Sequence, residues 1–180
     1  DVEVSMSYEA LPQVPEIDPN MTTEANPPDG FLPFLRDPET LARPWAVPGT
    51  PGLQHRIGGL EKQDGTGNIS YDPDNHQHMT EIRLEKVQRI ADRLPEVEVD
   101  DPDGDADLVV IGWGSTYGPI RGAVGRLRER GAKVARIHLR YVSPLPRGLG
   151  EALQRYRRVI CPENNMGQLS MLLRAAYLVD

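Results

Sequence analysis

Proline is distributed so unevenly along this chain that its two parts cannot fold by the same rules. Of 17 prolines, 13 lie in residues 1–105, and ten of those fall within residues 1–54. Proline fixes φ and has no backbone N–H to donate, so this density forbids regular helix or inner strand in residues 1–54. A segment of this composition would be unfolded in isolation.

The same segment nevertheless carries large apolar side chains. They are Phe31, Phe34, Leu35, Leu41, Trp45 and Val47. The sequence therefore predicts that residues 1–75 form an irregular, Pro- and Gly-rich arm lying over another surface, with Trp45 as an interface anchor. The competing interpretation is a passive linker.

Charge divides the chain at a similar place. Residues 1–105 carry 22 Asp or Glu against 8 Lys or Arg, whereas residues 106–180 carry 5 against 12. We expect a helix and an acidic linker in residues 76–105, followed by an α/β domain in residues 106–180. The chain begins at Asp1 rather than Met, and this favours a part of a longer polypeptide.

Composition also limits where the protein works. No run of about 18 apolar residues is present, which predicts no membrane span. No positively charged and then apolar leader opens the chain, which predicts no signal peptide. The single cysteine excludes an internal disulfide and favours the cytoplasm.

Periodicity predicts one helix and then a regular alternation of elements. Residues 75–94 place apolar side chains on one helical stripe, and Pro95 ends it. Residues 108–111 (LVVI) are a continuous apolar run, typical of a strand buried on both faces. After this run the pattern predicts a helix that ends at Gly131 and an alternating strand at 134–141. It then predicts a short helix, a strand at 158–161 and a last helix marked by Leu169, Leu172, Leu173 and Ala176. The order is βαβαβα, which predicts a small parallel sheet with the alternating strand at an edge or against a partner.

The turn after the first strand raises the question of a bound cofactor. Gly112 and Gly114 begin a dinucleotide fingerprint, but Tyr117 stands where the third glycine belongs, and no acid ends the next strand. Gly114, Ser115 and Thr116 remain weak candidates for an anion site at the helix start. The alternative, which we favour, is a cap whose hydroxyls bond the backbone.

A second turn, residues 163–169 (ENNMGQL), joins the third strand to the last helix. Ligands in open parallel sheets gather at the carboxyl ends of strands, so this turn and the first should lie side by side there. Glu163 could be a buried acid. We favour instead an interface or structural role for Glu163, Asn164, Gly167 and Gln168, with Glu163 and Asn164 satisfying turn and cap donors.

Other constellations are incomplete, so no catalytic residue is assigned. His55, His76 and His78 lack metal-ligand spacing and only Cys161 offers a thiol, which predicts no metal or cluster on this chain. The few aromatic residues and the absence of a recognised binding motif argue against nucleic acid as a ligand. The alternative function is an anion-binding module for coenzyme A or an acidic electron-transfer partner. Its candidates are Arg126, Arg128, Arg130, Arg155, Arg157 and Arg158.

Several segments together resemble a known family. Residues 107–116 (DLVVIGWGST), 134–146 (ending SPLP) and 160–169 (ICPENNMGQL) are similar to a domain of the α subunit of 2-oxoacid:ferredoxin oxidoreductases. Residues 33–52 (PFLRDPETLARPWAVPGTPG), 55–59 (HRIGG) and 71–79 (YDPDNHQHM) resemble the linker of its 2-oxoglutarate branch, KorA. The resemblance covers about residues 31–180.

The resemblance implies a fold like the transketolase C-terminal domain. It also implies an enzyme that decarboxylates a 2-oxoacid, reduces ferredoxin and yields an acyl-CoA. Thiamine diphosphate, Mg²⁺, a [4Fe-4S] cluster and coenzyme A are implied for the whole enzyme. The family's diphosphate-binding Gly-Asp-Gly motif is missing here, because no glycine precedes Asp64-Gly65. We therefore expect no cofactor on this chain, and an assembly role with the β subunit, the rest of the α subunit and ferredoxin as partners.

Overall fold

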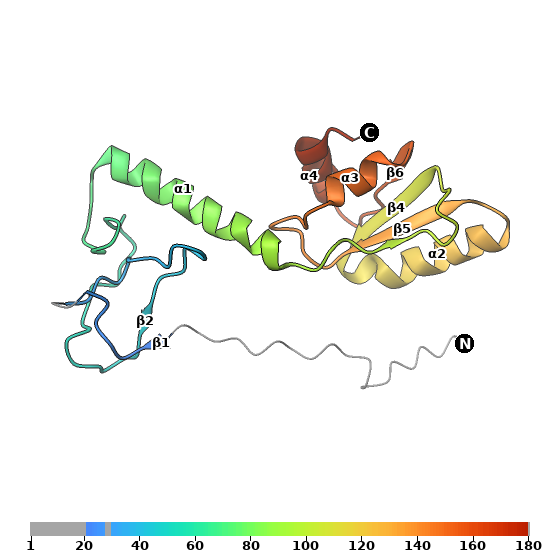
Figure 1. Cartoon of the computed structure of the whole chain (residues 1–180). Helices are drawn as coiled ribbons and strands as arrows, with labels where there is room; N and C mark the ends of the chain where they lie inside the picture. The colour runs from blue at the N-terminus through green and yellow to red at the C-terminus, as the bar shows by residue number, and fades with distance from the viewer. Residues whose placement is uncertain (1–20, 28–29, 180) are drawn as a thin grey trace. The chain divides into compact units, whose positions relative to one another are not determined.

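Two compact units make up the chain, Asp1–Ile82 and Arg83–Asp180. The computed structural model describes residues 21–27 and 30–179, and Figure 1 shows the elements along it. The part of the predicted arm in residues 1–20 lies outside the described residues. The helix α1 (Pro73–Arg89) runs from the first unit into the second.

The first unit is mostly irregular, as its prolines require. Its strands are β1 (Met21–Thr22) and β2 (Trp45–Ala46), which pair in parallel over two residues. Turns and single bridges connect the rest, for example between Phe34 and Gly65. Few of its side chains are fully buried; Leu53 and Met79 are its buried large apolar residues among those described. A core this small cannot hold the unit by apolar burial alone.

The helix α1 begins at Pro73, two residues before the predicted start. Proline suits the first turn of a helix, because the backbone N–H that it lacks has no partner there. The helix gives way to a short 3-10 helix, η2 (Ile90–Arg93), and Leu94 is already extended. The expected end before Pro95 is thus confirmed, although the last turn is tighter than an α-helix.

The second unit has the predicted βαβαβα order. Its elements are β4 (Leu108–Trp113), η3 (Gly114–Thr116), α2 (Tyr117–Glu129), β5 (Val134–Leu139), α3 (Leu149–Gln154), β6 (Arg158–Ile160) and α4 (Gln168–Tyr177). The strand β4 pairs in parallel with both β5 and β6. The α/β fold class with a small parallel sheet is therefore confirmed.

One strand was not predicted, and it corrects the place of β5. The strand β3 (Val99–Asp100) pairs with β5 in antiparallel orientation, so that the sheet order is β3-β5-β4-β6. Of the two places predicted for the alternating strand, the edge was wrong, because β5 has a neighbour on each side. A place against a partner stays a prediction. β5 also ends at Leu139, so Tyr141 lies beyond it.

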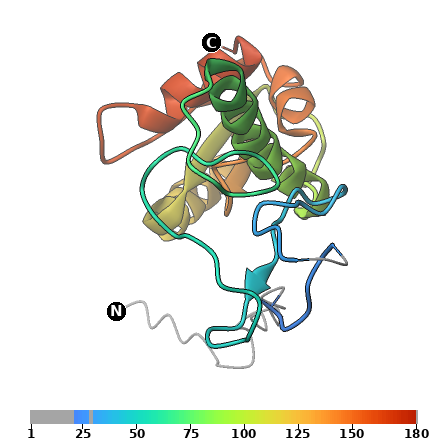
Figure 2. The same cartoon turned by 90° about the vertical axis from the view of Figure 1, so that its left-hand side faces the viewer.

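The sheet has a helical layer on each face, as Figures 1 and 2 show. On one face, α3 and α4 pack on a large cluster that includes Val109, Ile111, Ile137, Leu153 and Leu173. On the other face, Ile120 and Val124 of α2 pack on Val110 and Val134. Successive residues of β4 thus point to opposite clusters, which is why its sequence is continuously apolar.

Candidate site at the carboxyl edge of the sheet

The carboxyl ends of β4 and β6 lie next to each other, since these strands pair in parallel. From β4 the chain crosses to β5 on one side and later to β6 on the other. The crevice between two such strands is where open α/β sheets commonly bind ligands. The second predicted turn, residues 163–168, comes after β6. The first, predicted for residues 112–116, begins only at Gly114, because Gly112 and Trp113 still belong to β4.

A side-chain hydrogen bond joins the two turns and occupies this position. The indole Nε1 of Trp113 donates to Oε1 of Glu163 at 3.4 Å. The expectation that the turns lie side by side is confirmed. The role of Trp113 was missed, because a tryptophan at the end of a strand gives no sequence signal for its distant partner.

Glu163 also caps the last helix. Its Oε1 accepts from the backbone N–H of Leu169 at 2.9 Å, and its Oε2 accepts from that of Ser170 at 3.0 Å. The amide of Asn165 donates to Oε1 as well. Burial by itself would raise the pKa of Glu163, but these backbone and side-chain donors together hold that pKa below its usual value. The carboxylate therefore serves the turn and the helix end.

The neighbouring thiol is not poised for chemistry. Burial, followed by the nearby charge of Glu163, raises the pKa of Cys161 to about 12. The reactive form of a cysteine is the thiolate, and at this pKa almost none is present at neutral pH. Cys161, expected in the strand at 158–161, lies just beyond β6 and is half-buried.

The Gly114–Thr116 turn is tied to its own backbone. The hydroxyl of Thr116 donates to the carbonyl of Trp113 at 2.7 Å and accepts from its N–H at 3.1 Å. Gly114 has a positive φ of 55°, and Ser115 is exposed. Gly112 is required by packing, because a Cβ there would lie 2.2 Å from Cδ1 of Ile120. An anion site on these three residues stays a prediction; the geometry supports the capping alternative for Thr116.

The remaining residues of the second turn face outward. Asn164 and Gln168 are exposed, and Gly167 has a φ of 84°, which glycine adopts without strain. Asn165, rather than Asn164, makes the turn contacts, because its Oδ1 accepts from the N–H groups of Gly167 and Gln168. The interface role of Asn164 and Gln168 stays a prediction.

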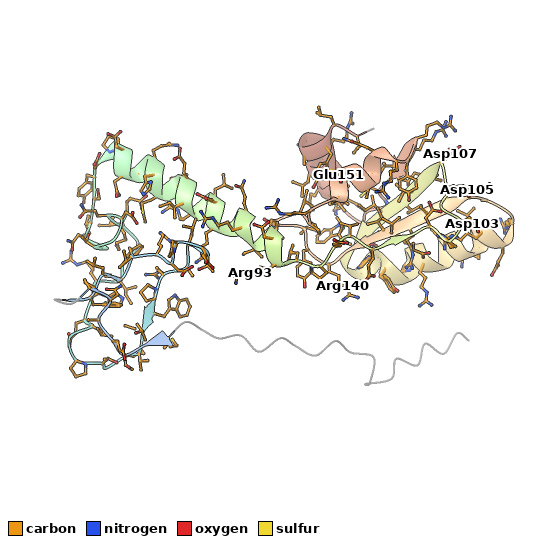
Figure 3. The ribbon with its side chains drawn as sticks, in the orientation of Figure 1. Arg93, Asp103, Asp105, Asp107, Arg140 and Glu151 are labelled. Atoms are coloured by element: carbon orange, nitrogen blue, oxygen red, sulfur yellow. The ribbon has the colours of Figure 1, made fainter. Side chains whose placement is uncertain are left out.

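The basic helix faces meet an acidic segment within the same unit. Asp100 of β3 accepts from Arg128 at 3.0 Å and from Arg136 at 2.8 Å. Burial alone would raise the pKa of Asp100, but these two arginines lower it. Lys133 pairs with Asp105 in the loop before β4. Figure 3 shows Asp103, Asp105 and Asp107 at the end of the sheet opposite Arg140. The excess of arginine after residue 106 is thus partly neutralised in space.

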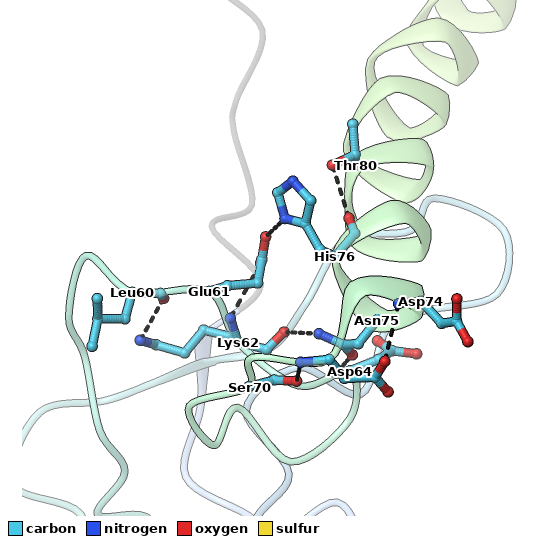
Figure 4. Close-up of polar contacts among 10 residues, drawn as sticks. Leu60, Glu61, Lys62, Asp64, Ser70, Asp74, Asn75, His76 and Thr80 are labelled. Carbon is cyan, nitrogen blue, oxygen red and sulfur yellow. Dashed lines mark hydrogen bonds and ion pairs between the residues drawn. The ribbon is translucent and has the colours of Figure 1, made fainter.

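In the first unit, hydrogen bonds fasten the loop before α1 to the start of that helix (Figure 4). His76 Nδ1 contacts Glu61 at 2.6 Å, and the amide of Asn75 donates to the carbonyl of Lys62 at 2.9 Å. Lys62 is itself buried, with its ammonium donating to the carbonyl of Leu60. Trp45, the predicted anchor, is 58% exposed.

The residues that the structure describes contain no cluster of three or more metal-ligating side chains. His76 hydrogen-bonds to Glu61, whereas His78 hydrogen-bonds to Asp64, so the two histidines contact different carboxylates. No helix within those residues is long and apolar enough to cross a membrane.

Comparison with known proteins places this geometry in context. Residues 106–178 match a family model described as pyruvate:ferredoxin oxidoreductase core domain II. The chain is 55% identical to the 2-oxoglutarate oxidoreductase subunit KorA of Mycobacterium tuberculosis over 170 residues, which are 94% of this chain and 26% of that protein. It is 39% identical to 2-oxoacid:ferredoxin oxidoreductase 1, subunit alpha, of Aeropyrum pernix, covering 88% of this chain and 25% of that protein.

A solved structure shows the same similarity in three dimensions. The 2-oxoglutarate:ferredoxin oxidoreductase from Magnetococcus marinus, solved with 2-oxoglutarate, coenzyme A and succinyl-CoA bound, matches with a TM-score of 0.72 and 34% identity. The match covers 81% of this chain and 26% of that one. The chain therefore spans about a quarter of the length of these relatives.

Proposed function

Since the chain belongs to the family of 2-oxoacid:ferredoxin oxidoreductase α subunits, we propose that it is an assembly domain in the α subunit of a 2-oxoglutarate:ferredoxin oxidoreductase. That enzyme oxidatively decarboxylates a 2-oxoacid to an acyl-CoA and passes the electrons to ferredoxin. The names of the KorA relatives, and the 2-oxoglutarate bound in the Magnetococcus enzyme, support this substrate. The chain by itself is inactive.

The observation that carries the assembly role is the outward face of α4. Leu169 and Leu173 bury one side of the helix in the core, whereas Met171 on the opposite side is 61% exposed and Leu172 on the flank is 40% exposed. Arg174 is the one charged residue between Gln168 and Tyr177. A surface helix is normally polar on its outer side, and a helix that is apolar all round is normally buried. The face therefore fits burial against another part of the enzyme.

Exposed apolar side chains of the first unit also support the assembly role. Ile57 and Tyr71 are 85% and 87% exposed, and Trp45 is exposed too, while few apolar side chains of this unit are buried. Burying one such side chain stabilises a contact by about 1.5–3 kcal/mol. We propose that Trp45 anchors the arm to the surface that covers it.

The residues of this chain do not fit the cofactors that the family uses. The crevice at the carboxyl edge is occupied by Trp113 and Glu163, and the thiol of Cys161 is protonated at neutral pH. We propose that thiamine diphosphate, Mg²⁺, the [4Fe-4S] cluster and coenzyme A are held by other parts of the enzyme. No step of the reaction is assigned to a residue of this chain.

The partners follow from the same proposal. They are the rest of the α subunit, the β subunit and, through the complex, ferredoxin; nucleic acid and membrane are not partners. The KorA and alpha-subunit names of the relatives support a multi-subunit enzyme. We place it in the cytoplasm, because a chain whose single cysteine forms no internal disulfide fits a reducing compartment.

The second candidate, an anion-binding module for coenzyme A or an acidic partner, is favoured by the coenzyme A in the Magnetococcus enzyme. It is weakened by Asp100, which engages Arg128 and Arg136 within the fold. Salt-sensitive binding of coenzyme A that is lost in Arg155→Ala with Arg157→Ala would support it. If coenzyme A binding is unchanged in this double variant, Arg155 and Arg157 do not form the binding site.

The proposed assembly role is tested on the α4 face in the whole enzyme. We expect Met171→Glu with Leu172→Glu, in the full-length α subunit co-expressed with the β subunit, to weaken assembly at least about tenfold, or about 1.4 kcal/mol. Gln154→Glu on α3, which is also exposed, serves as the control and should assemble normally. Light scattering measures both. Assembly of the double variant at wild-type strength would contradict the proposal.

A further inference from the structure

One face of the sheet is only half covered. In the described part of the chain, the buried cluster on the α2 face consists of residues from β4, β5 and α2, with Leu108 and Ala132 beside them. On β6, Ile160 is the register partner of Val110, whose side chain belongs to that cluster. Partners in a parallel ladder point to the same face. Ile160 therefore points to the α2 face, where it is 48% exposed.

The flank of α2 that looks toward β6 is apolar. Arg128 reaches Asp100 of β3 and Tyr117 stacks against His138, so residues 117 and 128 mark the flank above β5. At about 100° per residue, Ala123 and Leu127 lie on the opposite flank, above β4 and toward β6. Ala123 is exposed, and Leu127 is 39% exposed.

Arginines surround these apolar side chains. Arg130 directly follows α2 on the same flank. Arg158 begins β6 as the register partner of Leu108, so it also points to the α2 face. Both are exposed, and the structure gives neither an ion pair within the described residues. We define the β6-side face as Ala123, Leu127 and Ile160 together with Arg130 and Arg158.

We infer that the β6-side face receives an amphipathic helix from elsewhere in the same α subunit, with an apolar stripe flanked by Asp or Glu. The inference rests on the proposed assembly function. Parallel sheets are almost always covered by helices on both faces, and here one helix position beside α2 is open. The relatives are about four times as long as the matched segment, which leaves ample chain to supply that helix. Acidic residues on it complement Arg130 and Arg158.

Site-specific cross-linking in the full-length α subunit identifies the occupant. A photoreactive phenylalanine analogue is placed at position 127, and at position 121 as a matched control on the same helix. Arg121 is equally exposed but lies on the flank above β5. We expect position 127 to cross-link to a helical, acid-flanked segment of the same polypeptide outside this chain. Cross-links that fall only within residues 83–180, or only on the β subunit, would overturn the inference.

Charge reversal tests the arginines separately. Arg130→Glu with Arg158→Glu should lower the melting temperature of the full-length α subunit by several degrees, and high salt should reduce the difference. Arg121→Glu should leave it within about one degree. Equal behaviour of the two variants would overturn the charge complementarity. A cross-link from position 172 on α4 to another part of the enzyme would keep the assembly function standing even if position 127 gave none.

Discussion

Trp113 and Glu163 stand 50 residues apart in sequence, yet a hydrogen bond from the indole to the carboxylate closes the carboxyl edge of the sheet. The same carboxylate receives the first N–H groups of α4. One glutamate thus fixes the end of β6, the start of α4 and the turn after β4. Removing this carboxylate should therefore destabilise all three segments.

We expect Glu163→Gln to lower the free energy of unfolding by about 1–2 kcal/mol at pH 7, because an amide is a weaker acceptor for two helix N–H groups. The pKa of Glu163 is lower in the folded state than its usual 4.5. The stabilisation is therefore fully present above about pH 4.5 and is lost as the pH falls through the folded-state pKa. Urea denaturation at several pH values measures it. Glu151→Gln on α3 removes a charge without this cap, and should change little.

Gly112→Ala should destabilise the domain by about 1–3 kcal/mol. The added Cβ would meet Ile120 and Thr116, at 2.2 and 2.6 Å, so α2 must shift away from the sheet. Gly125→Ala within α2 meets nothing within 4 Å and should instead stabilise by up to about 1 kcal/mol. Thermal unfolding followed by circular dichroism compares the two. The same sign for both changes would contradict the packing described here.

Asp100→Asn should loosen β3 from β5. The change leaves Arg128 and Arg136 without their charged acceptor, and hydrogen bonds to charged groups each contribute about 1.5–3 kcal/mol. Because part of this is offset by solvent at a half-exposed site, we expect a loss of about 1–2 kcal/mol. Hydrogen exchange at Val99 and Asp100 should rise with it. Asp103→Asn in the following exposed loop is the control, and unchanged exchange in Asp100→Asn would argue against the bridge.

Cys161 should react slowly with a disulfide reagent at pH 8 while the protein is folded. A thiol with a pKa of about 12 is almost entirely protonated at that pH. Denaturant should raise the rate at least about tenfold, towards that of an ordinary thiol. Rapid reaction of the native protein, measured by absorbance, would show that the thiol is not held as described.

Trp45→Ala should weaken association of the arm with the rest of the enzyme more than it changes residues 106–180. Trp45 is exposed within its unit, so its removal takes away an external contact and leaves the α/β core intact. Light scattering of the assembled enzyme and circular dichroism of the variant separate the two effects. Trp45→Phe, which keeps an apolar ring, should lie between. Unchanged assembly would identify the arm as a passive linker.

The sequence predicted those parts of the fold whose pattern is local. The run LVVI predicted a strand buried on both faces, and Gly131 predicted the end of α2, although β4 continues through Gly112 and Trp113, which were expected in the turn. The strand β3 was missed, because two residues in an acidic stretch carry no periodicity. Its place depends on Asp100 meeting two arginines that lie 28 and 36 residues away.

The limits of prediction from the sequence are clearest in α4 and around Lys62. Leu172 was grouped with Leu169 and Leu173 as a mark of the helix, yet it lies on the flank of α4 and is 40% exposed. In a helix that is apolar on both sides, periodicity alone cannot say which side meets the core. Lys62 is buried in a turn-rich segment, where a lysine gives no sign that its ammonium will meet a carbonyl. At the carboxyl edge, the cap by Glu163 was predicted, but its link to Trp113 was not.

The two outer strands of the sheet also differ in how readily a further strand can pair with them. β3 is only two residues long, so it offers little free strand edge beyond β5. β6 runs parallel to β4 and leaves its far side open within the described residues. Lateral growth of this sheet, whether by a native neighbour or by self-association of a truncated subunit, therefore finds more strand to pair with beyond β6 than beyond β3. Polar or proline substitutions at the far side of β6 are the place to suppress aggregation when the domain is handled apart from its enzyme.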